Sequence, residues 1–155
     1  MPRILVSRAQ TDLDRDLAVR IWGLANAARW RPAGELRATR VREKISSAEL
    51  LLVAHYGERP AGMLLAETYL EDGVPLPGIG HISMVFVDPA VWGSRVGSSL
   101  VRDLQNREFD GLSVWTRTDN RRAQRLYLST GFTDTGNRSA LQDGDEIMQF
   151  AWSAG

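Results

Sequence analysis

His81-Ile82-Ser83-Met84-Val85-Phe86-Val87-Asp88-Pro89 is the stretch on which the fold prediction rests. Its first part is an apolar run with β-branched and aromatic side chains, bounded by Gly80 in front and by Asp88-Pro89 behind. Such a run is typical of a largely buried strand that ends in a proline turn. Leu100, Val101 and Leu104 then recur at helical spacing, so a helix is predicted to begin near Arg95.

The turn between this strand and this helix contains Gly93 and Gly97. The first turn of a helix leaves backbone N–H groups without partners, and the helix dipole adds a positive potential there. Glycine also lets a ligand approach the backbone closely. A turn of this kind can therefore hold a phosphate group, although a plain strand-to-helix connection has the same composition.

A second strand and a second helix follow. Residues 112–116 are strand-like, Asn120 opens a helix that carries Ala123 and Tyr127, and Gly131-Phe132 closes it in the manner of a C-cap. The combined order is Val-x-Asp-Pro, Gly-x-x-x-Gly, strand, Asn-x-x-Ala-x-x-x-Tyr and Gly-Phe. This pattern resembles the GNAT superfamily of N-acetyltransferases, which move acetyl groups from acetyl-CoA to amines.

The rest of the chain fits the order of elements in that family. The sequence predicts a first strand at residues 4–6, helices at 11–28 and 35–47, and a hairpin at 50–67. A proline- and glycine-rich connection at 71–78 and two final strands at 133–137 and 147–152 are also predicted. We therefore expect one GNAT-like domain over residues 1–155. Its fold class is α/β (α+β), with a mixed central sheet of about seven strands flanked by about four helices.

Composition excludes several classes of function. Lys+Arg and Asp+Glu balance at 19 each, so no net charge favours nucleic acid or an anionic membrane. The chain has no cysteine, which excludes disulfides, thiolate metal sites and a cysteine nucleophile; no metal site is expected. The start is too short and too soon polar for a signal peptide, so a cytoplasmic location is expected. The oligomeric state stays open, with a homodimer as one expectation.

The resemblance implies that acetyl-CoA is the cofactor, and it assigns contacts to the stretch after His81. The pantetheine arm is expected along Val85, Phe86 and Val87, as an added strand would pair. The phosphates are expected at the following turn, and further contacts come from the second helix. The remaining expected cofactor residues are Trp92, Gly93, Ser94, Arg95, Val96, Gly97, Ser98, Asn120, Ala123 and Tyr127.

The phosphate turn departs from the family pattern Arg/Gln-x-x-Gly-x-Gly/Ala at two positions. Trp92 stands at the Arg/Gln position and Arg95 at the first glycine, whereas Gly97 is retained. Arg95 could form a charge-assisted bond to phosphate, or its side chain could crowd the turn. We expect binding to be retained, because backbone donors do most of this work.

Three residues are candidates for moving protons. His81 is the leading candidate for the general base, because histidine titrates near neutral pH and several family members carry a glutamate or histidine at this strand position. Glu67, on a neighbouring strand, is the alternative base. The resemblance assigns the role of general acid to Tyr127, whose phenol is expected to face the cofactor sulfur; a packing role within the core is the alternative.

The acceptor side is less defined. Ser83 lies on the same strand face as His81 by alternation and could position a water, and Glu67 is a second candidate contact. Trp30, in the connection between the first two helices, either packs between them or overhangs the acceptor cleft. The chain is therefore interpreted as an acyltransferase that acetylates a small primary amine, such as an amino acid, a polyamine or an antibiotic, by direct attack in a ternary complex. A protein or peptide acceptor, or a CoA-binding sensor without catalysis, remains the alternative.

Overall fold

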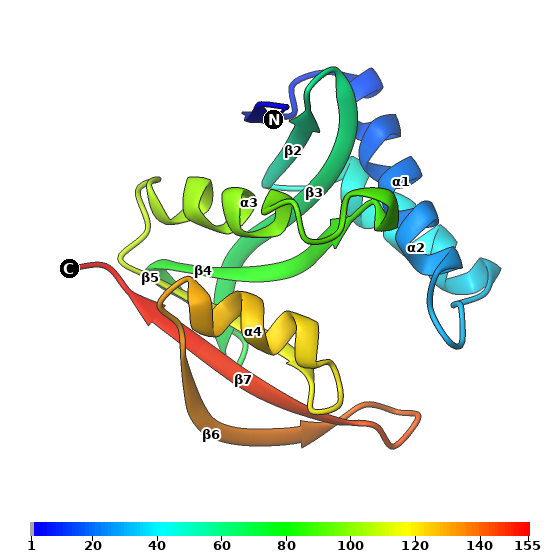
Figure 1. The fold of residues 1–155 in the computed structure, drawn as a ribbon. Helices are drawn as coiled ribbons and strands as arrows, with labels where there is room; N and C mark the ends of the chain where they lie inside the picture. Colours follow the sequence, from blue (N-terminus) through cyan, green and yellow to red (C-terminus); the bar gives the residue numbers. More distant parts are fainter. Residues whose placement is uncertain (1) are drawn as a thin grey trace.

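Residues 2–155, which the computed structural model describes, contain seven strands in one sheet, in the order β1-β2-β3-β4-β5-β7-β6 (Figure 1). The strands are β1 (Ile4–Arg8), β2 (Leu50–Tyr56), β3 (Arg59–Glu71), β4 (Val74–Val87), β5 (Gly111–Arg117), β6 (Thr133–Ala140) and β7 (Glu146–Ser153). The helices are α1 (Asp12–Ala27), α2 (Glu35–Ser46), the short 3-10 turn η1 (Pro89–Val91), α3 (Val96–Gln105) and α4 (Arg121–Ser129). The predicted mixed sheet and its flanking helices are confirmed.

Among the paired strands of residues 2–155, only β4 and β5 run parallel, and they pair over a short length. Residues Ile79 to Ile82 of β4 face Gly111 to Val114 of β5, while the other neighbouring strands pair antiparallel. Both strands continue past this point without pairing to each other. The sheet therefore splits along its middle, and the split leaves one backbone edge of β4 open.

A bulge in β4 lies where the split begins. Leu65 of β3 pairs with Met84, but the next residue, Ala66, pairs with Ile82, so Ser83 is an extra residue in the ladder. An extra residue reverses the alternation of side chains beyond it. Accordingly, Ile82 packs into the hydrophobic core on the side of α3 and α4, whereas Met84 packs into the core on the side of α1 and α2.

Helices cover both faces of the sheet (Figure 1). The larger core lies between the sheet and the pair α3 and α4, and it includes Leu64, Leu100 and Tyr127. The smaller core lies under α1 and α2, and it includes Ile21 and Met63. Burial of these apolar side chains is the main favourable contribution to folding.

Gly62 allows α3 to approach β3 closely. A Cβ atom at this position would lie 2.7 Å from Cγ1 of Val96 and 3.0 Å from Cδ1 of Leu100, both in the buried face of α3. Neither neighbour is the far end of a flexible polar side chain, so a larger residue would push the helix away from the sheet. The position of α3 relative to β4 thus depends on a glycine in the neighbouring strand.

The prediction of an irregular connection over residues 71–78 is wrong. β3 extends to Glu71 and β4 begins at Val74, so only Asp72 and Gly73, both with positive φ, connect the two strands. An Asp-Gly pair of this kind forms a tight hairpin turn. Pro75 and Pro77 are tolerated because β5 pairs with β4 only from Ile79 onward, so their missing N–H groups interrupt no ladder on that edge.

None of the helices within residues 2–155 has the length and apolar character needed to cross a membrane.

Candidate functional site

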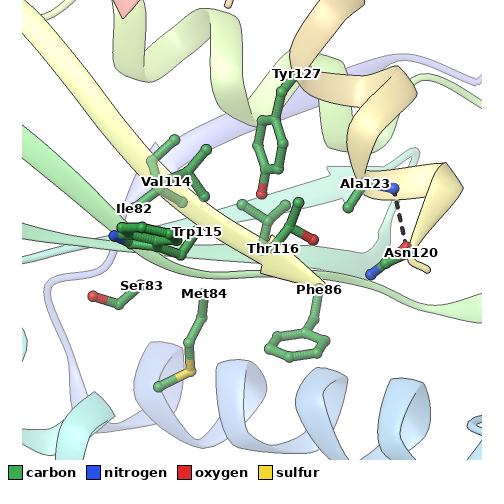
Figure 2. A pocket seen from close by; sticks show the side chains of 11 residues that line it. Ile82, Ser83, Met84, Phe86, Val114, Trp115, Thr116, Asn120, Ala123 and Tyr127 are labelled. Carbon is green, nitrogen blue, oxygen red and sulfur yellow. Dashed lines mark hydrogen bonds between the residues drawn. The ribbon is translucent and has the colours of Figure 1, made fainter. Parts of the chain in front are cut away.

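A pocket occupies the split between β4 and β5, beneath α4 (Figure 2). It is lined by Ile82, Ser83, Met84, Val85 and Phe86 of β4, by Val114, Trp115 and Thr116 of β5, and by Asn120, Ala123 and Tyr127 at α4. The lining combines apolar side chains with a few hydroxyl and amide groups. A groove with an open strand edge on one wall suits an extended, amide-containing ligand.

Tyr127 extends from α4 toward the pocket, and Figure 2 shows its hydroxyl directed at the gap between the strands. The residue is 5% exposed, and its ring packs against Phe132 and Phe150 with centroid separations of 5.5 and 5.9 Å. Burial raises the pKa of the Tyr127 phenol well above its usual value. The phenol therefore keeps its proton at neutral pH, with the ring held by the core.

Asn120 caps α4 at the edge of the same pocket. Its Oδ1 accepts a hydrogen bond from the backbone N–H of Ala123 at 3.1 Å (Figure 2), which satisfies one of the free amides of the helix start. Capping is confirmed, and the contact of Asn120 with a cofactor stays a prediction.

The turn after β4 presents free backbone donors. Among residues 2–155 no acceptor is found for the amides of Gly93, Arg95, Val96, Gly97 and Ser98, and Ser99 is the first residue to donate within the helix, to Arg95 O at 3.0 Å. Because α3 begins here, the helix dipole adds a positive potential to these donors. The arrangement fits the phosphate groups of a CoA molecule.

Arg95 adopts a left-handed backbone conformation, with φ 72°, immediately before α3. It occupies the position at which the family pattern has glycine. The conformation is costly for a residue with a Cβ atom. The turn thus keeps the backbone shape expected of glycine while carrying an exposed guanidinium that has no acidic partner within residues 2–155.

Trp92 connects the end of β4 to the start of α4. Its Nε1 donates to the carbonyl oxygen of Val87 at 3.1 Å, and the guanidinium of Arg122 lies 3.4 Å from the centroid of its ring. Such a cation–π contact contributes about 0.5–2 kcal/mol. The Val87 carbonyl, expected to meet the pantetheine arm, is therefore already bonded to the indole.

At the bulge, on the face of the sheet that α2 covers, the Glu67 carboxylate accepts bonds from two donors. The hydroxyl of Ser83 donates to Oε2 of Glu67, and Nζ of Lys44 lies 2.9 Å from the same oxygen. Burial disfavours the charged carboxylate, but the hydrogen bonds from Ser83 and Lys44 outweigh it, so the pKa of Glu67 lies below its usual value. Glu67 is therefore ionised at neutral pH.

His81 lies next to Glu67, its partner in the β3–β4 ladder. Its Nδ1 is buried and has no hydrogen-bond partner within residues 2–155, and its ring lies 6.0 Å from the ring of Tyr69. Burial lowers the pKa of His81, partly opposed by the negative charge of Glu67 and assisted by the positive charge of Lys44. The imidazole is thus neutral at pH 7 and able to accept a proton.

A polar cluster around the buried side chains of Ser113 and Gln149 joins the strands on this side of the sheet. Nε2 of Gln149 donates to Ser113 Oγ at 2.9 Å and to the hydroxyl of Tyr69 at 3.4 Å, and its Oε1 accepts from Asn137 Nδ2 at 2.8 Å. These bonds join β3, β5, β6 and β7 and hold Tyr69 beside His81. We refer to Tyr69, Ser113, Asn137 and Gln149 as the Gln149 cluster.

The structure brings most of the predicted residues to the split. Ser83, Val85, Phe86, Asn120, Ala123 and Tyr127 line the pocket, Val87 and residues 92–98 continue from the end of β4, and Glu67 and His81 flank the bulge. Trp30 is 91% exposed, so the predicted packing role between the helices is wrong. Its contact with an acceptor, like the other functional roles, stays a prediction.

Several residues of the site were not predicted. The β5 residues of the pocket wall depend on β4 and β5 being parallel neighbours. Lys44 belongs to none of the motifs in the sequence, although it is the only lysine of the chain. Gln149 has a visible signal, since it is the one polar residue in the run 147–152, and the structure buries it.

Comparisons with known proteins agree with the fold. The model of the Acetyltransferase (GNAT) family matches residues 18–132, while no curated protein matches the chain significantly. The fold is similar to the ribosomal-protein-S18-alanine N-acetyltransferase from Escherichia coli, with 20% identity, TM-score 0.72 and coverage of 99% of this chain and 97% of that chain. It is also similar to a GNAT-family acetyltransferase from Bacillus cereus, with 18% identity, TM-score 0.76 and coverage of 99% of each chain.

A third similar structure is the NatC complex bound to Gag peptide and CoA, with 18% identity, TM-score 0.69 and coverage of 99% of each chain. At these identities the structural matches show the shared fold. The family model spans most of the chain and includes the split strands, the turn before α3 and Tyr127. The chain therefore belongs to the Acetyltransferase (GNAT) family and is an acetyltransferase, a class of enzyme that uses acetyl-CoA.

Proposed function

We propose that this chain transfers the acetyl group of acetyl-CoA to the primary amine of a small molecule, by direct attack in a ternary complex. The observation that carries the proposal is the arrangement around the β4 bulge. Tyr127 lines the split from the side of α4, and the Ser83–Glu67 hydrogen bond lies on the other face of the same strands. A proton donor and two proton acceptors thus flank one opening in the sheet.

The residues around the split fit acetyl-CoA. The edge of β4 around Val85 is free of β5 and can pair with the amide groups of the pantetheine arm. The free amides of Gly93 and of residues 95–98, together with the guanidinium of Arg95, can bind the phosphates. Acetyl-CoA supplies the acetyl group in the activated form of a thioester.

Two groups can accept the proton of the acceptor amine. His81 is neutral because burial lowers its pKa, and Glu67 is ionised because its donors lower its pKa. Glu67 also carries the negative charge that binds an ammonium group, and its side chain is 33% exposed. Glu67 and His81 are paired with each other in the β3–β4 ladder. Either side chain can therefore receive the proton of the amine, directly or through a water.

The proton that converts the departing CoA thiolate to the thiol is assigned to Oη of Tyr127. Its raised pKa keeps the phenol protonated, and its packed ring fixes the position of the oxygen within the pocket. Without a cysteine in the chain, an acetyl-cysteine route is closed, which supports direct attack.

A small acceptor is favoured over a peptide by the side chains around Glu67 and His81. Tyr69 lies against His81 and is tethered to Gln149, and Lys44 lies on Glu67. A peptide acceptor would need a longer open channel past the same side chains.

The test is release of free CoA thiol from acetyl-CoA, measured with a thiol-reactive chromophore. The absence of cysteine means that the reagent reports CoA alone. The panel contains amino acids, polyamines, aminoglycosides and short peptides with a free N-terminus. We expect release with at least one small amine and loss of release in Tyr127→Phe. Release with peptides only would make the chain a peptide acetyltransferase, and acetyl-CoA binding without release would make it a CoA-binding sensor.

A further inference from the structure

Lys44 reaches from α2 to the carboxylate that faces the β4 bulge. Its Nζ lies 2.9 Å from Oε2 of Glu67, and it is the single lysine among the 19 basic residues of the chain. The other basic residues of α2 form no ion pair with Glu67; Arg42, for example, pairs with Glu35 at 2.9 Å. A primary ammonium group of the protein itself therefore lies on the candidate acceptor site.

The Glu67 oxygen in question already has two donors. Ser83 donates its hydroxyl to Oε2, and the Lys44 ammonium bonds to the same atom. A carboxylate oxygen accepts about two strong hydrogen bonds. An acceptor that arrives as an ammonium ion would bind best at the position that Lys44 fills, and it would also meet the positive charge of Lys44.

The surroundings offer Lys44 a second place to bind. Lys44, Glu49 and Glu67 line one small hollow together with Ser47, Ala48 and Leu65. Glu49 is exposed, and both bonds to its carboxylate, from the Thr68 amide at 3.3 Å and the Thr68 hydroxyl at 2.9 Å, end on Oε2, so neither of them uses Oε1. The Lys44 side chain is 47% exposed, so it can swing from Glu67 toward Glu49.

We propose that Lys44 is a specificity-determining residue, a resident cation on Glu67 that an acceptor ammonium must displace. This inference rests on the proposed function. It follows that the enzyme disfavours strongly basic alkylamines, which are cations at neutral pH, relative to weakly basic amines that arrive neutral. The charged and titratable groups that face Glu67 are Lys44 from α2, Glu49 before β2, Tyr69 from β3 and His81 from β4.

The experiment compares the wild type with Lys44→Met, which keeps the length of the side chain and removes its charge. With a cationic alkylamine, KM should fall by about two- to fivefold, the range expected for loss of one exposed ion pair, while kcat changes less. Lys44→Arg should restore the wild-type KM. Arg40→Met, on the same helix and without an ion pair in residues 2–155, is the control and should match the wild type.

Two further arms separate charge from packing. A weakly basic arylamine should show the same KM with the wild type and with Lys44→Met, because a neutral amine does not compete for the charge of Glu67. In a Glu67→Gln background, Lys44→Met should no longer change KM. An unchanged KM for the cationic amine in Lys44→Met, or a fall in kcat alone, would overturn the role of Lys44. The proposed acetyl transfer would still hold in that case if the wild type releases thiol. Absence of thiol release by the wild type with every amine would overturn both.

Discussion

Tyr127 lies in two environments at once. Its ring belongs to the core beside Phe132 and Phe150, and its hydroxyl faces the split between β4 and β5. The two interpretations drawn from the sequence, core aromatic and proton donor, therefore concern different atoms of one side chain. The core fixes the ring, and the fixed ring directs the hydroxyl.

Tyr127→Phe should separate these two roles. The ring packing is retained, so the midpoint of thermal unfolding should change little. Loss of the proton donor should lower kcat by about 10²- to 10⁴-fold, the usual contribution of general acid catalysis, with little change in acetyl-CoA affinity. Steady-state thiol release and a binding titration measure the two quantities. Unchanged kcat would remove Tyr127 from the reaction.

His81 should make stability depend on pH. Burial holds the pKa of His81 below the 6.5 of the unfolded chain, so the unfolded state binds a proton first as pH falls. The free energy of unfolding should therefore be fully retained above about pH 6.5 and should decrease below it. Urea unfolding at about pH 7.5 and about pH 5.5 measures the difference. In His81→Gln the decrease should be smaller, and an equal decrease would assign it to other groups.

At this scale, the sequence revealed residues that belong to a local motif. Asn120, Ala123 and Tyr127 have helical spacing from a cap, so their common face follows from one helix. Lys44 and Glu67 are a different case. Their contact depends on how α2 lies against β3, and the Gln149 cluster depends on the register of four strands. No spacing within one element encodes either contact.

Among the elements, the turn from β4 into α3 combines strain with charge. Arg95 has φ 72° where glycine would have no strain, and its guanidinium is exposed beside the free amides of the helix start. The left-handed conformation disfavours a residue with a Cβ atom by about 1–2 kcal/mol. We infer that the strain is retained because the guanidinium binds phosphate.

Arg95→Gly and Arg95→Ala together test this inference. Glycine should raise the free energy of unfolding by about 1 kcal/mol relative to alanine, because only glycine relieves the strain. Both variants should weaken acetyl-CoA binding by about tenfold, since a hydrogen bond to a charged group is lost. Urea unfolding and a binding titration measure these changes. Tighter binding by both variants would show instead that the arginine crowds the turn.

Prediction of β4 from the sequence was accurate at its end and inaccurate at its start. Asp88-Pro89 ends the strand visibly, and η1 follows with Asp88 accepting from the Ala90 amide at 3.0 Å. The start was placed too late because Pro75 and Pro77 are typical of loops. Prolines are tolerated there only because the neighbouring edge is open. The bulge at Ser83 has no sequence signal, since it arises from the pairing with β3.

At the scale of the whole molecule, the sheet splits where β4 and β5 are held by different neighbours. α3 and α4 pack on one face and α1 and α2 on the other (Figure 1), and the bulge transfers β4 side chains from one core to the other at Ser83. Past Ile82, each strand is held by its own helices and outer neighbours rather than by the other strand. The number and order of elements could be predicted from the pattern of motifs, whereas the split itself required the register.

The most direct test of the account is the thermal shift of the protein with acetyl-CoA, compared with ATP and NAD. At a hundred times the dissociation constant, a ligand stabilises by about 2.7 kcal/mol, which corresponds to roughly 5–10 °C for a chain of this size. Ala123→Phe places a ring in the pocket between the split strands and should abolish the shift. Without ligand, the unfolding midpoint of this variant should fall by less than the shift that acetyl-CoA causes in the wild type. In the wild type, a shift is expected with acetyl-CoA and with neither ATP nor NAD. No shift, or an equal shift in Ala123→Phe, would contradict acetyl-CoA binding in the split between β4 and β5.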